Sequence, residues 1–219
     1  IASEHAVILG YGRDDLLREN HFWVLSRMYA VFSSRPSWSD TIVAKTWPAG
    51  VDKLFAMRNY DLADKNGVNV AYASSAWLII DRDTKKIQRP DEFLRSYDRE
   101  NQMIEIPVRY PAKLREADED GILSPAFKVK VGDLDINLHT NNVNYLKWTI
   151  VVYDLDFMMK HVPSSVEINY LAESMLGDSI IIRTSREAGP GLFFRHVIFR
   201  TGDNRELCRI KLGWKERKN

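Results

Sequence analysis

Eight stretches rich in aromatic and β-branched residues run along this chain, four in each half. Such residues favour β-strands, and strand runs separated by glycine- or asparagine-containing turns are typical of hairpins. Asp64–Gly67 predicts a turn before the last strand of the first half, and Thr201–Asn204 predicts the corresponding turn of the second half. The expected strands are 22–32, 41–47, 54–62 and 70–80, then 165–170, 179–185, 192–200 and 206–214.

A helical periodicity precedes each set of strands. In the second half, apolar residues recur at spacings of three, four, three and four, which predicts one helix of about four turns over residues 143–157. Asn141 or Asn142 is a suitable N-cap for this helix. In the first half, Ser3–Leu9 predicts a shorter helix that ends at Gly10. The apolar stripe of the longer helix consists of Val143, Leu146, Ile150, Tyr153 and Phe157.

The two halves resemble each other in sequence at a constant offset of 138 residues. Residues 38–46 match residues 176–184 in pattern, and Leu54-Phe55 matches Leu192-Phe193. A helix followed by an antiparallel sheet, occurring twice, predicts an α+β chain of two similar units. We expect an N-terminal unit over 1–95, a linker over 96–125, and a C-terminal unit over 126–219.

Size and charge narrow the function classes. The chain has 219 residues, 45% of them hydrophobic, which is enough for one large core or two smaller ones. The formal net charge of +1 gives no electrostatic case for nucleic acid or for a membrane surface. No apolar run is long enough to span a bilayer, so membrane insertion is not expected. The chain opens on Ile1 instead of Met, so we expect that residues precede it and that the first unit is truncated.

The chain contains one cysteine, Cys208. It alternates with Ile210, Leu212 and Trp214, which is typical of the buried face of a strand, where cysteine acts as a small hydrophobic residue. We therefore expect Cys208 to be structural and not a nucleophile. A single cysteine excludes an internal disulfide and is typical of a reducing compartment, so a cytoplasmic location is expected.

The segment Asp133–His139 carries the clearest chemical signal. Asp133, Asp135, Asn137 and His139 alternate with three aliphatic residues, which predicts an extended strand with its polar groups on one side. Carboxylate, amide and imidazole groups together can position water, move a proton and donate a hydrogen bond. Asp135 and His139 would lie about 13 Å apart in a fully extended chain. We therefore expect the chain to turn near residues 138–140 and bring His139 back towards Asn137.

This segment also resembles a family signature. The spacing of Asp135, Asn137, His139, Asn141-Asn142, Tyr145 and Trp148 is similar to that of the acyl-acyl carrier protein thioesterases of plants and bacteria. Phe22–Arg27, Thr46-Trp47 and Tyr170-x-x-Glu173-Ser174 resemble further segments, especially those of the bacterial members. The resemblance covers nearly the whole chain. It implies a tandem hotdog fold, with a long helix wrapped by a curved sheet in each unit, and a catalytic motif in the second unit.

The resemblance implies four site residues, Asp135, Asn137, His139 and Glu173, and neither a cofactor nor a metal ion is expected. Plant members carry a cysteine after the glutamate, where this chain has Ser174. A thiolate mechanism at that position is therefore excluded here.

Two mechanisms remain open. The leaving thiol of a thioester has a pKa of about 8.5, so the main tasks are supplying a nucleophile and stabilising the oxyanion. In the first mechanism His139 or Glu173 activates water, Asn137 holds the water or the carbonyl oxygen, and Asp135 orients its neighbours. Backbone N–H groups at the start of the helix would contribute to the oxyanion site. In the second, Glu173 or Asp135 attacks directly and forms a mixed anhydride.

The expected function is hydrolysis of fatty acyl-acyl carrier protein thioesters in fatty acid biosynthesis. The alternatives are an acyl-coenzyme A thioesterase of the same fold, a hotdog dehydratase and a non-catalytic acyl-binding hotdog protein. The expected partner is the acyl carrier protein, and a homodimer is an optional further assembly. Because carrier proteins are acidic, we expect a basic docking patch, with candidates Lys85, Lys86, Arg89, Lys215, Arg217 and Lys218.

Overall fold

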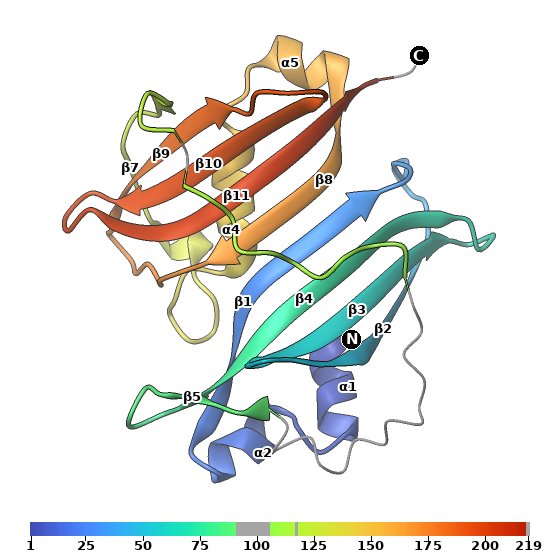
Figure 1. Ribbon diagram of the computed structural model, residues 1–219, viewed down its shortest axis with the longest axis vertical. Helices are drawn as coiled ribbons and strands as arrows, with labels where there is room; N and C mark the ends of the chain where they lie inside the picture. Colours follow the sequence, from blue (N-terminus) through green and yellow to red (C-terminus); the bar gives the residue numbers. More distant parts are fainter. Residues whose placement is uncertain (91–105, 117, 218–219) are drawn as a thin grey trace. The chain divides into compact units, whose positions relative to one another are not determined.

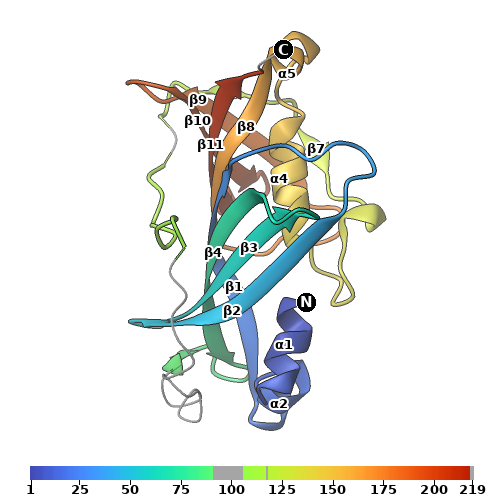
Figure 2. The same ribbon diagram turned by 90° about the vertical axis from the view of Figure 1, so that its right-hand side faces the viewer.

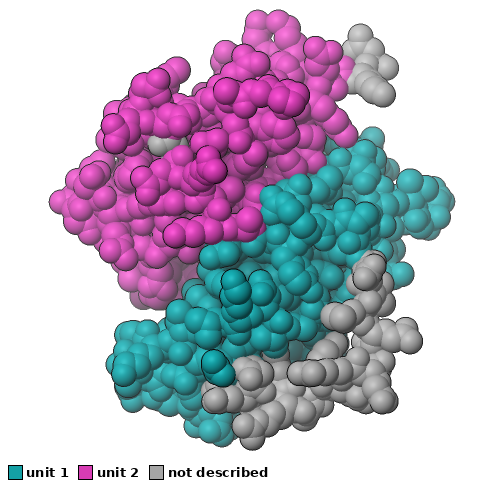
Figure 3. Space-filling view, viewed as in Figure 1, with its two compact units in different colours: residues 1–111 teal, residues 112–219 magenta. Residues whose placement is uncertain are grey.

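The computed structural model describes residues 1–90, 106–116 and 118–217, and it divides into two compact units. Unit 1 comprises Ile1–Pro111 and unit 2 comprises Ala112–Asn219 (Figure 3). Part of the expected linker, residues 96–105, lies outside the described residues. Within the described parts of the chain, no helix is long and apolar enough to cross a bilayer.

Unit 1 consists of two short helices followed by an antiparallel sheet (Figure 1). The four long strands lie in the order β2-β3-β4-β1, and the short β5 pairs with β4. Both helices lie on the same side of this sheet (Figure 2). The elements are α1 (Ala2–Ile8), α2 (Arg13–Arg18), β1 (His21–Phe32), β2 (Ile42–Asp52), β3 (Phe55–Asp64), β4 (Asn69–Asp81) and β5 (Ile87–Gln88).

Unit 2 repeats this plan and adds short segments at its start. Its long strands lie in the order β8-β11-β10-β9, β6 continues the sheet beyond β9, and β7 also pairs with β9. Helix α4 lies against one face of the sheet (Figure 2). The elements are β6 (Ile122–Leu123), β7 (Phe127–Lys128), the 3-10 helix η1 (Val131–Asp133), α4 (Asn142–Ile150), α5 (Leu155–Lys160), β8 (His161–Tyr170), β9 (Ser179–Arg186), β10 (Leu192–Arg200) and β11 (Arg205–Glu216).

The strand orders confirm the internal repeat. Strands β2, β3, β4 and β1 of unit 1 correspond to β9, β10, β11 and β8 of unit 2 and have the same neighbours. All eight predicted strands are present, and most extend a few residues beyond the predicted ends. The predicted short helix at the start of the chain is α1. The α+β class and the antiparallel sheets are therefore confirmed.

The single helix predicted over 143–157 is wrong, because the chain forms two helices, α4 and α5, in this region. Asp154 is the reason: it adopts an extended backbone conformation, and its carboxylate accepts a hydrogen bond from Phe157 N at 2.7 Å, which caps α5. The cap of α4 is confirmed, since Asn141 Oδ1 accepts from Val143 N at 3.1 Å.

The buried face of α4 also differs from the predicted apolar stripe. Val143 is 47% exposed, whereas Asn144, Tyr145, Trp148 and Thr149 are buried. Two of these are polar and have partners. Asn144 Nδ2 donates to Asp133 O at 2.8 Å, and Thr149 Oγ1 donates to Tyr145 O at 2.8 Å. Hydrogen bonds remove the cost of burying these groups, so polarity alone did not identify the inner face.

The sequence prediction missed helix α2. Gly12 is its N-cap residue, and Asp15 Oδ2 accepts from Gly12 N at 2.9 Å. An acidic residue three positions after the cap stabilises a helix start, and it is the sequence signal that could have identified this helix.

Cys208 is fully buried in β11, with Ile198 of β10 as its cross-strand partner. Burial raises the pKa of its thiol well above the usual value. Ile210 and Leu212, which follow on the same face of the strand, are also buried. The structural role predicted for Cys208 is confirmed.

A second buried polar group in unit 2 is His196 on β10. Its Nε2 lies 2.8 Å from the Tyr153 hydroxyl and its Nδ1 lies 2.9 Å from Thr184 Oγ1. Trp214 Nε1 donates to the Tyr153 hydroxyl at 3.1 Å. Burial lowers the pKa of His196 to about 3, so the ring is neutral in the folded chain.

This histidine makes the stability of the fold depend on pH. An unfolded histidine binds a proton below about pH 6.5, whereas folded His196 does so only near pH 3, so unfolding takes up a proton between these values. Above about pH 6.5 the ring is neutral in both states, and His196 does not make stability depend on pH. As the pH falls below this value, protonation of the unfolded state lowers the free energy of unfolding. We expect His196 to lower the free energy of unfolding by about 2 kcal/mol between pH 7 and pH 5.

Urea unfolding at both pH values measures this difference. A His196→Gln variant has lower stability at both values, but the difference between them should shrink by about 2 kcal/mol. An unchanged difference in the variant would contradict the prediction.

Candidate active site

The segment Asp135–His139 forms a tight turn. Asp135 N donates to His139 O at 2.8 Å, and Asp135 Oδ1 accepts from Asn137 N at 2.8 Å and from His139 N at 3.2 Å. Leu138 adopts a positive φ of 63° within this turn. The carboxylate of Asp135 therefore holds the backbone on which Asn137 and His139 are carried.

The predicted extended row is wrong, and so is the predicted position of the turn. The turn lies over Ile136–Leu138 and not over residues 138–140, and Ile136 and Leu138 are 87% and 70% exposed. The reason is that an aspartate side chain competes for backbone N–H groups that a strand would pair with a neighbour. This reversal of the chain brings the backbone of His139 back to Asp135, and the expected approach of His139 to Asn137 stays a prediction.

His139 lies beside Glu173, which follows strand β8. His139 Nδ1 is 3.3 Å from Glu173 Oε1, and the two side chains are 38% and 59% exposed. His139 also pairs with Met175 in an isolated antiparallel bridge. Two residues that lie far apart in sequence thus form a solvent-accessible acid–imidazole pair on unit 2.

Arg200 stabilises the loop that carries Glu173. Its Nη1 lies 3.4 Å from Glu173 O and 3.2 Å from Asp178 Oδ2. Asp178 Oδ2 also accepts from Met175 N at 2.9 Å. On its other side the guanidinium binds Asp203, at 3.0 and 2.8 Å. The sequence prediction missed Arg200, because it lies on β10 and no spacing relates it to the motif.

Ser174, next to Glu173, is fully buried. Its Oγ lies 2.7 Å from Thr140 Oγ1 and 3.0 Å from the Tyr145 hydroxyl. A hydroxyl without exposed surface and with two hydrogen-bond partners is a structural group. Neither Thr140 nor Tyr145 was among the four site residues predicted from the sequence.

The start of α4 has little free hydrogen-bonding capacity. Asn141 Oδ1 accepts from Val143 N, and Asn141 O accepts from Asn144 N at 2.9 Å. These two N–H groups are therefore already paired. Asn137 is exposed on the turn. Its side-chain amide is therefore the better candidate for an oxyanion donor.

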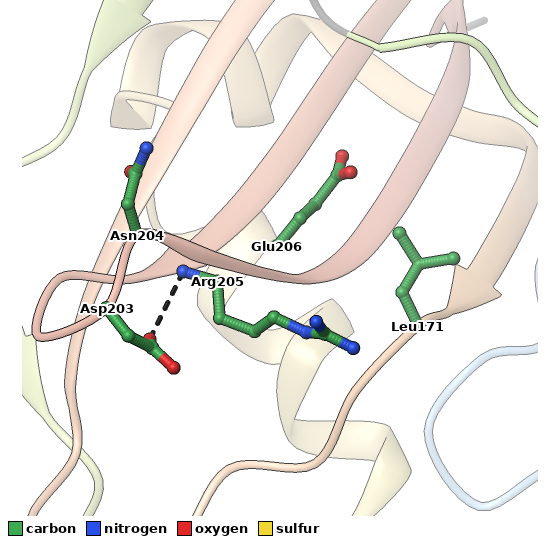
Figure 4. A pocket seen from close by; sticks show the side chains of 5 residues that line it. All are labelled: Leu171, Asp203, Asn204, Arg205 and Glu206. Carbon is green, nitrogen blue, oxygen red and sulfur yellow. Dashed lines mark hydrogen bonds between the residues drawn. The ribbon is translucent and has the colours of Figure 1, made fainter.

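A surface hollow of about 460 Å³ lies on unit 2, lined by Leu171, Asp203, Asn204, Arg205 and Glu206 (Figure 4). Asp203 Oδ1 accepts from Arg205 N at 3.2 Å at its edge. Neither His139 nor Glu173 lines it. In the described ranges, no group of three or more histidine, cysteine or carboxylate side chains is placed to hold a metal ion.

Comparison with known proteins places this chain in a family. Residues 1–97 match the model of the acyl-ACP thioesterase N-terminal domain, and residues 116–216 match that of the C-terminal domain. The chain belongs to the acyl-ACP thioesterase family. The motif residues and Glu173 all lie in the second of these two domains.

One relative of this family member is a chloroplastic acyl-acyl carrier protein hydrolase of Cuphea viscosissima. It is 28% identical over 94% of this chain and 52% of its own length. The chain thus spans about half the length of the first curated relatives that it matches.

Solved structures of family members have the same fold. An acyl-ACP thioesterase from Bacteroides thetaiotaomicron matches with a TM-score of 0.83 and 24% identity, over 98% of this chain and 85% of the other. A 12:0-ACP thioesterase from Umbellularia californica matches with a TM-score of 0.83 and 18% identity, over 99% and 86%. The expected tandem hotdog fold is confirmed. The expected bacterial origin stays a prediction, because both plant and bacterial proteins match.

Proposed function

We propose that this chain hydrolyses fatty acyl-acyl carrier protein thioesters to a free fatty acid and the carrier thiol. The observation that carries the proposal is the 3.3 Å separation of His139 Nδ1 and Glu173 Oε1. Membership of the family and the names of its relatives support the same reaction. By the same analogy we propose a place in fatty acid biosynthesis, and the single cysteine supports the proposal of a cytoplasmic location.

In this proposal His139 is the general base, and Glu173 orients and stabilises it. Glu173 accepts a hydrogen bond from Nδ1–H of His139, which leaves the Nε2 lone pair free to take a proton. A water molecule gives that proton to Nε2 as its oxygen bonds to the thioester carbonyl carbon. The carbon–sulfur bond then breaks, and the leaving thiolate takes the proton from Nε2 of the imidazolium, which restores the neutral ring. Glu173 stabilises the imidazolium that forms in between.

Asn137 and Asp135 support this step from the turn. The Asn137 amide donates to the carbonyl oxygen as negative charge develops on it. Asp135 keeps the turn closed, because its Oδ1 accepts two backbone N–H groups. That use of its carboxylate makes Asp135 a poor nucleophile.

Direct attack by Glu173 is the second mechanism. It forms a mixed anhydride, which water then hydrolyses. Turnover in heavy-oxygen water tests for this route: label in the Glu173 carboxylate shows an anhydride opened at the glutamyl carbonyl and excludes simple attack by water.

The carrier is the proposed partner. The candidate docking residues lie in both units, Lys218 lies outside the described residues, and Arg217 already donates to Met158 O at 3.3 Å. Lys85 lies over the Phe22 ring at 5.7 Å. Lys85 and Arg217 are both exposed, so an acidic partner can approach them.

Substrate preference tests the proposed function. We expect kcat/KM on dodecanoyl, palmitoyl or oleoyl carrier protein to exceed that on the matching coenzyme A ester by about tenfold or more, because only the carrier offers a protein surface to dock. Thiol release measures both reactions. A preference for coenzyme A would favour the acyl-coenzyme A thioesterase, and binding without release would favour the non-catalytic acyl-binding protein.

A further inference from the structure

A buried hydrogen-bonded cluster lies directly behind the acid–imidazole pair. Its members are Thr140, Tyr145 and Ser174, which are 5%, 2% and 0% exposed. Thr140 follows His139 in the chain, Ser174 follows Glu173, and Tyr145 lies on α4. Each residue of the pair is therefore the immediate sequence neighbour of a member of this buried cluster.

Five contacts join the three residues. The backbone N and the Oγ1 of Thr140 both donate to Ser174 O at 3.0 Å, and the hydroxyls of these two residues lie 2.7 Å apart. The Tyr145 hydroxyl lies 3.0 Å from Ser174 Oγ and accepts from Ser174 N at 3.2 Å. The cluster thus holds both the backbone and the side chain of Ser174.

The His139–Glu173 contact cannot fix its own geometry. A contact between side chains that are 38% and 59% exposed contributes little, since water competes for both partners. Hydrogen bonds away from water are stronger and more directional. The distance between the imidazole and the carboxylate is therefore set by the backbones behind them, and the buried cluster joins those backbones.

We propose that Thr140 and Tyr145 are positioning residues for hydrolysis, acting through Ser174 to hold Glu173 against His139. The inference rests on the proposed function only in taking the pair as catalytic. The Tyr145 hydroxyl binds both Ser174 N and Ser174 Oγ, so its removal loosens the backbone and the side chain of Ser174 together. Burial raises the pKa of Tyr145, so its hydroxyl stays protonated at neutral pH and can donate to Ser174 Oγ.

The test compares two tyrosine variants of the full chain. Tyr145→Phe removes the hydroxyl from the buried cluster, and we expect it to lower kcat about tenfold with KM within about twofold, because the error lies in the orientation of the pair. The matched control is Tyr153→Phe, which also removes a hydroxyl with two partners, His196 and Trp214, outside the cluster. The control should retain kcat within about twofold.

A second comparison separates positioning from folding. Thr140→Val keeps the shape and loses the hydroxyl, whereas Thr140→Ser keeps the hydroxyl. We expect kcat to fall about tenfold in the valine variant and to stay within about threefold in the serine variant. Circular dichroism and urea unfolding confirm that each variant is folded before its rate is measured.

The outcomes distinguish this inference from the proposed function. If Tyr145→Phe and Tyr153→Phe lose kcat equally, or if Thr140→Ser falls as far as Thr140→Val, positioning by the buried cluster is overturned. Both comparisons are ratios to the parent chain and hold for any thioester that it cleaves. A parent chain that cleaves coenzyme A esters alone would overturn the proposed substrate and leave this test intact.

Discussion

Replacement of His139 with alanine should lower kcat about a thousandfold, with KM changed by no more than about threefold. The imidazole is the group that takes the proton from water in the proposed mechanism, and alanine leaves no base at that position. Nothing else in the turn replaces it, because Asp135 Oδ1 is held by two backbone N–H groups. The loss should therefore appear in the chemical step and not in substrate binding.

Steady-state rates of thiol release from acyl carrier protein measure this loss. His5→Ala is a control, because His5 lies on α1 of unit 1 and its Nδ1 contacts Arg58. Its kcat should match that of the parent chain. A His139→Ala variant with more than about a tenth of the parent kcat would remove His139 from the chemical step.

Replacement of Glu173 with glutamine should lower kcat about a hundredfold. Glutamine keeps the size of the side chain and a carbonyl oxygen that can accept from Nδ1–H, but it has no charge to stabilise the imidazolium. Because part of the orientation survives, the loss should be smaller than that of His139→Ala. If Glu173 is the nucleophile, the amide cannot form the anhydride, and the loss should equal or exceed that of His139→Ala.

The comparison of these two variants therefore decides between the mechanisms. Glu4→Gln is a suitable control, since Glu4 is an exposed residue of α1 in unit 1. Activity retained in Glu173→Gln within about threefold of the parent would remove Glu173 from both mechanisms.

The sheets could be predicted from the sequence because their signals are local. Aromatic and β-branched stretches end at turn residues, and Asp64 accepts from Asn66 N and Val68 N in the turn between β3 and β4. The helices were harder to predict. A regular apolar stripe continued through Tyr153 and Phe157, although Asp154 starts a new helix between them. The capping effect of one side chain outweighed the periodicity.

The site was predictable only in part. Alternating polar residues over 133–139 indicate a strand, and nothing in that pattern shows that Asp135 will bind the backbone instead. Glu173 was identified by family resemblance, since its contact with His139 joins two segments far apart in sequence. Arg200, Thr140 and Tyr145 act through tertiary hydrogen bonds. No spacing or composition marks such bonds in advance.

The burial of Cys208 has a practical consequence. It is the chain's only cysteine, it has no exposed surface, and burial raises the pKa of its thiol. Maleimide reagents attack accessible thiolates, so the folded native chain should not react with them. A cysteine introduced at any surface position would then be the sole point of attachment for a fluorophore, a spin label or a crosslinker to the carrier, without prior removal of Cys208.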